Sequence, residues 1–232
     1  MSEAFDLTVV VPTLNEEGSL RQVLPRLKET FARLGVRGQI LVVDGRSKDA
    51  TVAVAESLGA RVLVQTARGL GGALREGLLA AESPWVAVVD ADGSHPPEVL
   101  AEMWAKRDEA DLVIASRYVP GGSAVMDPLR QVLSRSLNVV ARLVLGLPAR
   151  DSSGGFRLYR AELVRPVCAA AIATDFTIQQ ELLVGILSRG GRVLEVPFRY
   201  EPRIDGASKA SALRLAPAYI RMLIRLRGRR RS

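Results

Sequence analysis

The chain has 232 residues, 48% of them hydrophobic, which is enough for one large core, and a formal net charge of +7. Its single cysteine, Cys168, excludes an internal disulfide and a multi-cysteine zinc site. Nine basic residues and one acid follow Pro202, so the rest of the chain carries −1 and the positive charge belongs to the C-terminal end. A near-neutral body with 5% aromatic residues argues against a nucleic-acid partner.

Apolar, valine-rich runs alternate along the chain with longer amphipathic stretches. Strands are predicted at Leu7–Val11, Gln39–Val43, Arg61–Gln65, Trp85–Val89, Asp111–Ala115 and Arg192–Val196. Helices are predicted at Glu16–Leu34, Asp49–Leu58, Gly71–Ala81, Pro97–Arg107, Pro128–Leu145 and Asp175–Arg189. Strands without polar alternation, separated by helices, indicate an α/β protein with a doubly wound, mostly parallel sheet that helices cover on both faces.

The fourth predicted strand ends in Asp90-Ala91-Asp92, two carboxylates one residue apart. A buried parallel strand delivers its last residues to the sheet edge where ligands bind, and hard oxygen ligands suit Mg²⁺ or Mn²⁺. The alternative is a polar turn or a helix cap. His95, the single histidine, follows the pair and is either a polar turn residue or a contact to substrate or to the metal shell.

The first two strands also end in polar residues. Val11-Pro12-Thr13-Leu14-Asn15-Glu16 either caps a helix at Asn15 or adds a nucleotide contact at the same edge. Asp44 is either an Asx-turn residue or a hydrogen-bond acceptor for a base or a ribose. The segment 69–77 is glycine-rich but lacks the G-x-G-x-x-G spacing, which leaves close helix packing and a phosphate contact both open.

Together these motifs resemble a family 2 glycosyltransferase with the GT-A fold, and within it the polyprenol-phosphate (dolichol-phosphate) mannosyltransferase group. The resemblance covers nearly the whole chain. Its most specific motif is R-x-x-G-x-S-K, which appears as Arg203-Ile204-Asp205-Gly206-Ala207-Ser208-Lys209. The other matching segments are 11–16, 90–92, 116–118, 130–134, 151–157 and 179–181.

The resemblance implies a nucleotide-sugar site and the roles of its residues. The nucleoside would contact Pro12, Leu14, Glu16 and Val43, with Asp44 and Gly45 beside it. The ribose side and the metal–diphosphate would be held by Asp90, Ala91 and Asp92, with the metal on Asp90 and Asp92. Phosphates or the donor sugar would be bound by Arg117, Arg203 and Lys209, and the acceptor phosphate by Arg117, Arg130 and Ser134. The residues implied for catalysis are Asp92, Arg117 and Glu181, although Glu181 can equally be a helix-surface or loop-facing acid.

The chain departs from the family pattern after the second strand. The usual Asp-Asp-Gly-Ser is Asp44-Gly45-Arg46-Ser47 here, so glycine stands where the family has its second aspartate. Leu14 replaces a usual tyrosine, and Gly154 replaces a usual serine. The first two changes leave guanine and uracil both open as the base of the donor.

The segment from Leu213 to Arg231 is predicted to form a basic amphipathic helix, so the expected division is a GT-A domain at 1–210 and a tail at 211–232. Arg214, Arg221 and Arg225 share one face, and the other side carries Leu215, Tyr219, Ile220, Met222, Leu223 and Leu226. Such a helix either lies on an anionic membrane surface or docks on the protein. Pro217 would begin or kink it.

The implied reaction is inverting transfer of a hexose, best matched by mannose from GDP-mannose, to a polyprenol monophosphate. A UDP-sugar donor with a lipid-phosphate or soluble acceptor is the alternative enzyme, and a nucleotide-sugar-binding protein is the alternative without catalysis. No signal pattern or long apolar run is found, so we expect a cytoplasmic protein at the inner face of the membrane, with or without a separate membrane anchor.

Overall fold

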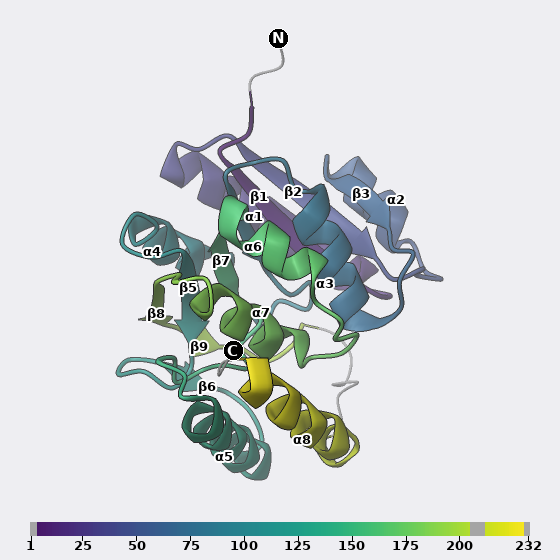
Figure 1. Ribbon diagram of the computed structural model, residues 1–232. Helices are drawn as coiled ribbons and strands as arrows, with labels where there is room; N and C mark the ends of the chain where they lie inside the picture. Colours follow the sequence, from purple (N-terminus) through teal and green to yellow (C-terminus); the bar gives the residue numbers. More distant parts are fainter. Residues whose placement is uncertain (1–3, 205–211, 230–232) are drawn as a thin grey trace.

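The computed structural model describes residues 4–204 and 212–229, the side chains of 212–218 and 229 excepted. Seven strands form one mixed sheet in the order β3-β2-β1-β4-β7-β5-β8 (Figure 1). They are β1 (Leu7–Thr13), β2 (Gly38–Asp44), β3 (Arg61–Val64), β4 (Trp85–Val88), β5 (Leu112–Ser116), β7 (Arg157–Arg160) and β8 (Val193–Pro197). Two short strands, β6 (Ser123–Ala124) and β9 (Arg199–Tyr200), pair separately beside this sheet.

Helices cover both faces of the sheet, as the sequence predicts. One face packs against α1 (Glu17–Leu34), α2 (Thr51–Ser57), the short 3₁₀ turn η1 (Pro97–Val99) and α4 (Leu100–Ala105). The other packs against α3 (Gly69–Ala80), α5 (Pro128–Leu145), α6 (Ala161–Ala169), α7 (Ile178–Leu187) and α8 (Ala212–Arg229). Each face has its own apolar cluster because successive residues of a strand point to opposite sides.

The central strands show why unbroken valine runs become parallel strands here. In β1, Val9 and Val10 are both fully buried, one in each cluster. Val10 pairs with Leu41 of β2 on one side and with Val88 of β4 on the other. A strand covered on both faces has no need of polar alternation, and the predicted α/β class is confirmed.

One strand and one helix of the main fold escape the sequence analysis. Strand β7 has the sequence Arg-Leu-Tyr-Arg, whose charged ends do not look like a buried strand. It nevertheless lies antiparallel between β4 and β5. Arg157 is fully buried and donates hydrogen bonds to the carbonyl oxygens of Gly154, Ser152 and Gln179 at 2.8, 2.7 and 2.6 Å. These bonds satisfy a buried guanidinium that composition alone places at the surface. Helix α6 follows directly and contains Pro166.

Helix α8 docks on the protein through its apolar side. Tyr219, Met222, Leu223 and Leu226 are at most 8% exposed and belong to the same cluster as α3, α6 and α7. The Tyr219 hydroxyl donates to the carbonyl of Leu137 in α5 at 2.8 Å. The expectation that these side chains face a membrane is therefore wrong, whereas Ile220 remains 58% exposed.

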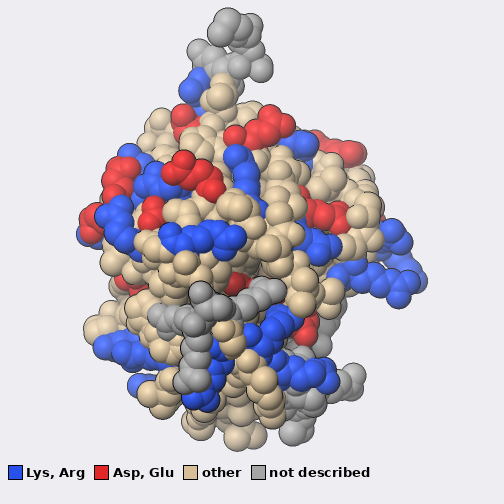
Figure 2. Space-filling model, in the orientation of Figure 1, with Lys and Arg blue, Asp and Glu red and all other residues tan. Residues whose placement is uncertain are grey.

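Acidic side chains are unevenly distributed over the face that Figure 2 shows. In the view of Figure 2, acidic side chains gather mainly over the upper part of the molecule, and the lower part around α5 and α8 shows mainly Lys and Arg. Within residues 4–204 and 212–229, no helix combines the length and apolar character that crossing a bilayer requires.

Candidate active site

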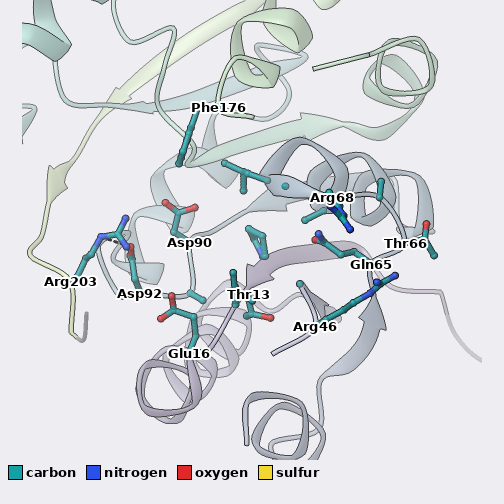
Figure 3. A pocket seen from close by; sticks show the side chains of 18 residues that line it. Thr13, Glu16, Arg46, Gln65, Thr66, Arg68, Asp90, Asp92, Phe176 and Arg203 are labelled. Atoms are coloured by element: carbon teal, nitrogen blue, oxygen red, sulfur yellow. Dashed lines mark ion pairs between the residues drawn. The ribbon is translucent and has the colours of Figure 1, made fainter. Parts of the chain in front are cut away.

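A cavity of about 510 Å³ lies at the carboxyl ends of four neighbouring strands, β4, β1, β2 and β3 (Figure 3). Crevices at this edge are the usual ligand sites of open α/β sheets. Eight of the residues predicted for the nucleotide sugar line the cavity: Pro12, Leu14, Glu16, Gly45, Asp90, Ala91, Asp92 and Arg203. Strand order brings seven of them together, since they lie at the ends of β1, β2 and β4. Arg203 returns to the cavity from the C-terminal part of the chain.

The two aspartates lie at one end of the cavity with a cationic partner (Figure 3). Asp92 Oδ1 accepts a hydrogen bond from the Ser94 N–H at 2.9 Å, and Asp92 Oδ2 lies 3.1 Å from Arg203 Nε. Burial raises the pKa of the Asp90 carboxyl, and the charge on Asp92 raises it further, whereas His95 and Arg203 favour its ionised form. The arrangement concentrates negative charge where a divalent cation would be held.

His95 is buried beside Asp90 and is not a turn residue at the surface. Its Nδ1 accepts a hydrogen bond from the Asp90 N–H at 3.1 Å, and its Nε2 lies 3.6 Å from Asp90 Oδ2. The ring is 3% exposed and stacks on Phe156 with centroids 5.2 Å apart. Since Nδ1 accepts, the neutral ring carries its proton on Nε2, which faces the Asp90 carboxylate.

The donor atoms at this end fit a metal that also binds the substrate. Asp90 and Asp92 offer carboxylate oxygens at the cavity. The buried hydroxyl of Ser94, two residues after Asp92, has no hydrogen-bond partner among the described residues. Among all the residues that the structure describes, no group of three or more His, Cys, Asp or Glu side chains could hold a metal by itself. Two carboxylates plus phosphate oxygens and water are the usual way in which proteins hold Mg²⁺.

Val43 and Asp44 do not reach the cavity, contrary to the prediction. Val43 is fully buried in the sheet. Asp44 is 1% exposed, and its carboxylate accepts hydrogen bonds from the Thr13 hydroxyl at 3.3 Å and from the Ser47 N–H at 2.9 Å. The Asp44 carboxylate therefore holds the turn at 44–47 and is not presented to the cavity.

Asn15 joins the two loops at the rim of the cavity instead of capping α1. The residue before α1 is Glu16, whose own side chain makes no capping bond, and the Glu17 N–H donates to Asp49 Oδ2 at 3.4 Å. Asn15 adopts a left-handed backbone with φ 56°, and its Oδ1 accepts from the Lys48 N–H at 2.8 Å. The Ser47 hydroxyl in turn accepts from the Asn15 N–H at 2.8 Å. These bonds fix the loops after β1 and β2 to each other.

The glycine-rich segment packs closely against another loop. A Cβ on Gly69 would lie 2.3 Å from the Thr174 carbonyl oxygen, and one on Gly71 would lie 2.2 Å from that of Ala173. The Gly71 N–H donates to the Thr174 carbonyl at 3.0 Å. Close packing, one of the two interpretations left open, explains both glycines.

Arg117 is committed to a buried partner and does not line the cavity. Its Nε and Nη2 lie 2.7 and 2.8 Å from the two carboxylate oxygens of Asp151, which is fully buried. Burial alone would raise the pKa of the Asp151 carboxyl, but the Arg117 guanidinium holds that pKa below its usual range. Arg117 Nη2 also reaches the Ser153 hydroxyl at 3.1 Å, and Ser153 accepts from Asn138 of α5 at 2.8 Å. Arg117 is thereby linked to α5 through Ser153 and Asn138.

Two of the three residues predicted for the acceptor phosphate, Arg130 and Ser134, lie on α5, one turn apart. Arg130 is exposed in the first turn of α5, and Ser134 follows four residues later on the same face. The Ser134 hydroxyl accepts a hydrogen bond from the Tyr118 hydroxyl at 2.7 Å. Lys209 lies outside the described residues.

Glu181 is a buried tether and does not line the donor cavity, where a catalytic residue would be expected. It is 2% exposed, and its Oε2 accepts from the N–H groups of Ile172 and Ala173 at 3.2 and 2.9 Å. Arg225 of α8 lies 3.3 Å from the same oxygen. Glu181 therefore joins α7 and α8 to the loop that packs on α3.

Several cavity residues were missed at the sequence level. Arg46, Gln65, Thr66 and Arg68 line the end opposite the aspartates, and Phe176 covers the cavity from the loop before α7 (Figure 3). The first four follow β2 and β3, so the strand order points to them. Phe176 comes from a distant part of the chain, and no local pattern indicates it.

The glycosyl transferase family 2 model matches residues 8–167, which is more than half of the chain. The chain belongs to glycosyl transferase family 2. It is 34% identical over 227 residues to the polyprenol monophosphomannose synthase of Mycolicibacterium smegmatis, covering 92% of this chain and 84% of that protein. It is 36% identical over 213 residues to the undecaprenyl-phosphate mannosyltransferase of Micrococcus luteus, covering 87% and 86%.

Solved structures share the fold of this transferase. The glucosyl-3-phosphoglycerate synthase of Mycobacterium tuberculosis, in complex with Mn²⁺, UDP-glucose and phosphoglyceric acid, superposes with a TM-score of 0.73. The match covers 97% of this chain and 80% of that one at 22% identity. At this identity the likeness shows the GT-A fold alone, which agrees with the fold predicted from the sequence.

Proposed function

We propose that the protein transfers mannose from GDP-mannose to a polyprenol monophosphate, with inversion at the anomeric carbon, at a membrane surface. The observation that carries the proposal is the cavity that joins the Asp90/Asp92 pair and Arg203 to the ends of β1 and β2. In this proposal one end of the cavity would take the sugar and diphosphate, and the other would take the nucleoside. The two relatives named above, a monophosphomannose synthase and a phosphate mannosyltransferase, favour mannose and a polyprenol phosphate.

At the diphosphate end, Asp90 and Asp92 would hold Mg²⁺ or Mn²⁺, which supplies positive charge that stabilises the leaving diphosphate. Arg203, now paired with Asp92, lies at the same end and adds a cationic donor of hydrogen bonds. His95 keeps the Asp90 carboxylate in place. These residues bind and orient the leaving group.

The acceptor needs no strong base in this proposal. A phosphate monoester has a second pKa of about 6 and is already anionic at neutral pH. The two groups that most resemble a base, His95 and Glu181, are buried and used in structural bonds. A nucleophile that arrives deprotonated agrees with this arrangement.

Helix α5 would seat the acceptor phosphate and face the lipid that carries it. Its exposed apolar side chains include Leu129, Val132 and Leu143, at 77%, 64% and 77% exposure. Arg130, Arg135 and Arg142 are exposed on the same helix. Apolar side chains among arginines suit the interface of an anionic bilayer, which is the occupant we assign to this surface. The protein would accordingly work at the inner face of the membrane, with or without a separate anchor.

A UDP-sugar is the second candidate donor because Gly45 offers no carboxylate where the family pattern has one. The test is transfer from GDP-mannose and from UDP-glucose to undecaprenyl phosphate in vesicles, each with Mn²⁺ and with chelator. Metal-dependent mannolipid formation from GDP-mannose alone supports the proposal. Glucolipid formation alone moves the assignment to the UDP-sugar enzyme, and nucleotide binding without transfer of either sugar indicates a binding protein.

A further inference from the structure

Arg46 lines the cavity, its side chain is exposed, and its backbone conformation is unfavourable for a residue other than glycine. Its φ is 65°, in the left-handed region that favours glycine. Asn15 is the other non-glycine residue with positive φ among the described residues, and its side chain bonds to the neighbouring loop. For Arg46, the described part of the chain provides no hydrogen bond and no ion pair. An unfavourable backbone conformation that no hydrogen bond or ion pair of the side chain offsets is typical of functional positions.

The position of Arg46 corresponds to the nucleoside end of the site. Figure 3 shows Arg46 with Gln65 and Arg68 at one end of the cavity and Asp90 and Asp92 at the other. Neighbouring strands are about 4.8 Å apart, so the ends of β2 and β3 lie roughly 10–14 Å from the end of β4. A nucleoside diphosphate whose phosphates meet the aspartates would therefore place its base beside Arg46.

The chemistry at this end calls for a base with acceptor atoms. Arginine presents donors only, in a planar fork that matches two neighbouring acceptors. Of the carboxylates near the ends of β1 and β2, Asp44 is buried and used by Thr13 and Ser47, and Glu16 accepts a hydrogen bond from the Ser19 hydroxyl at 3.0 Å. Gly45 has no side chain. Guanine offers O6 and N7 side by side, adenine places a donor beside N7, and uracil lacks such a pair of adjacent acceptors.

We infer that Arg46 is the specificity-determining residue for the donor base and that it binds the O6 and N7 edge of guanine. The inference rests on the proposed function for its donor class. In the family pattern an aspartate stands at the position of Gly45. Here Arg46, the next residue, would distinguish the bases instead.

The test compares dissociation constants for GDP, 7-deaza-GDP and UDP, measured by calorimetry with Mn²⁺ on the full chain. The wild type should bind GDP at least about 10-fold more tightly than 7-deaza-GDP, which lacks N7. Arg46→Gly should remove most of that difference. Because glycine fits φ 65°, its melting temperature should equal or exceed that of the wild type, which separates recognition from folding. Arg21→Ala, at an exposed position of α1, serves as the control and should keep the wild-type preference.

Two results would overturn the inference. One is an Arg46→Gly variant that keeps the preference for GDP over 7-deaza-GDP, above all if Arg68→Ala removes it. The other is an equal loss of affinity for GDP, 7-deaza-GDP and UDP, which would make Arg46 a phosphate contact. A wild type that shows the Arg46-dependent preference but forms no mannolipid would refute the proposed function and leave base recognition by Arg46 standing.

Discussion

Single residues of the site differ in how their charge is used. Asp92 is paired with Arg203 at the cavity, whereas Asp151 and Arg117 neutralise each other in the protein interior. Because Asp92 and Arg203 both line the cavity, a bound ligand or metal could replace one of them as the partner of the other. The pair of Asp151 and Arg117 is closed by good geometry on both carboxylate oxygens and serves the fold.

Asp92→Asn should abolish transfer while leaving the fold intact. The amide oxygen can still accept the Ser94 N–H, but the charge that holds the metal is lost. We expect turnover to fall by at least about 100-fold, the usual loss when one electrostatic group of a transition-state site is removed. Mannolipid formation and the circular dichroism spectrum measure the two effects. Glu102→Gln, an exposed change on α4, is the control, and full activity of Asp92→Asn would contradict the metal site.

Arg117→Met should destabilise the protein in a pH-dependent way. The wild-type pair lowers the pKa of Asp151, so its stabilisation is present above the unfolded-state pKa of about 3.9 and is lost as pH falls through the lower folded value. Without Arg117, a buried unpaired carboxylate should lower the free energy of unfolding by about 3–5 kcal/mol at pH 7.

Urea unfolding at pH 7 and pH 4 checks this prediction. In the variant, burial raises the pKa of Asp151, so protonation at pH 4 should shrink its deficit relative to the wild type. The double variant Arg117→Met/Asp151→Asn should recover much of the loss at pH 7. An equal deficit at both pH values would show that lost packing, and not charge, is the cause.

Among the elements, α7 and α8 influence the cavity without entering it. Glu181 of α7 and Arg225 of α8 hold the loop at 172–176, whose backbone packs on Gly69 and Gly71 and whose Phe176 covers the cavity. Docking of the C-terminal helix is thus connected to the donor site through a chain of direct contacts.

Glu181→Ala should weaken nucleotide binding and lower stability by about 1–3 kcal/mol, since two N–H groups lose their acceptor. Glu181→Gln keeps an acceptor oxygen, so its nucleotide affinity and its stability should lie between those of the wild type and those of Glu181→Ala. Calorimetry with GDP and thermal unfolding measure both effects. Wild-type affinity in Glu181→Ala combined with a large fall in turnover would instead restore the catalytic role expected from the sequence.

At the scale of the whole molecule, the proposed function assigns different tasks to two faces of the protein. The donor cavity lies at the strand ends, while exposed apolar and basic side chains gather on α5 beside α8 (Figures 1 and 2). Arg130 and Ser134, the residues proposed for the acceptor phosphate, lie on α5, so the proposed lipid-facing surface and the proposed phosphate site belong to one helix.

The triple variant Leu129→Ser, Val132→Ser, Leu143→Ser should reduce binding to vesicles rich in anionic lipid by about 10-fold or more, since each buried apolar side chain contributes to insertion. Co-sedimentation measures binding, and GDP affinity checks that the donor site is intact. Val64→Ser with Leu79→Ser changes exposed apolar side chains on β3 and α3 and should leave binding unchanged. Equal binding by wild type and triple variant would remove α5 from the membrane surface.

The sequence by itself determined the α/β class, the parallel core strands and the aspartate pair. Those features depend on local patterns: valine runs covered on both faces, and carboxylates at the end of a strand. Only the tertiary structure decided the environments of Arg117, Glu181 and Arg157, because each has a partner far along the chain, 34, 44 and 22 residues away. A charged side chain looks the same in a sequence whether it is buried or exposed. The insertion of β7 between β4 and β5 and the docking of α8 were likewise decided by long-range packing. The apolar side of a helix is the same whether it meets a membrane or a protein core, and here contacts with α5 and α7 settle the choice for Tyr219, Met222, Leu223 and Leu226.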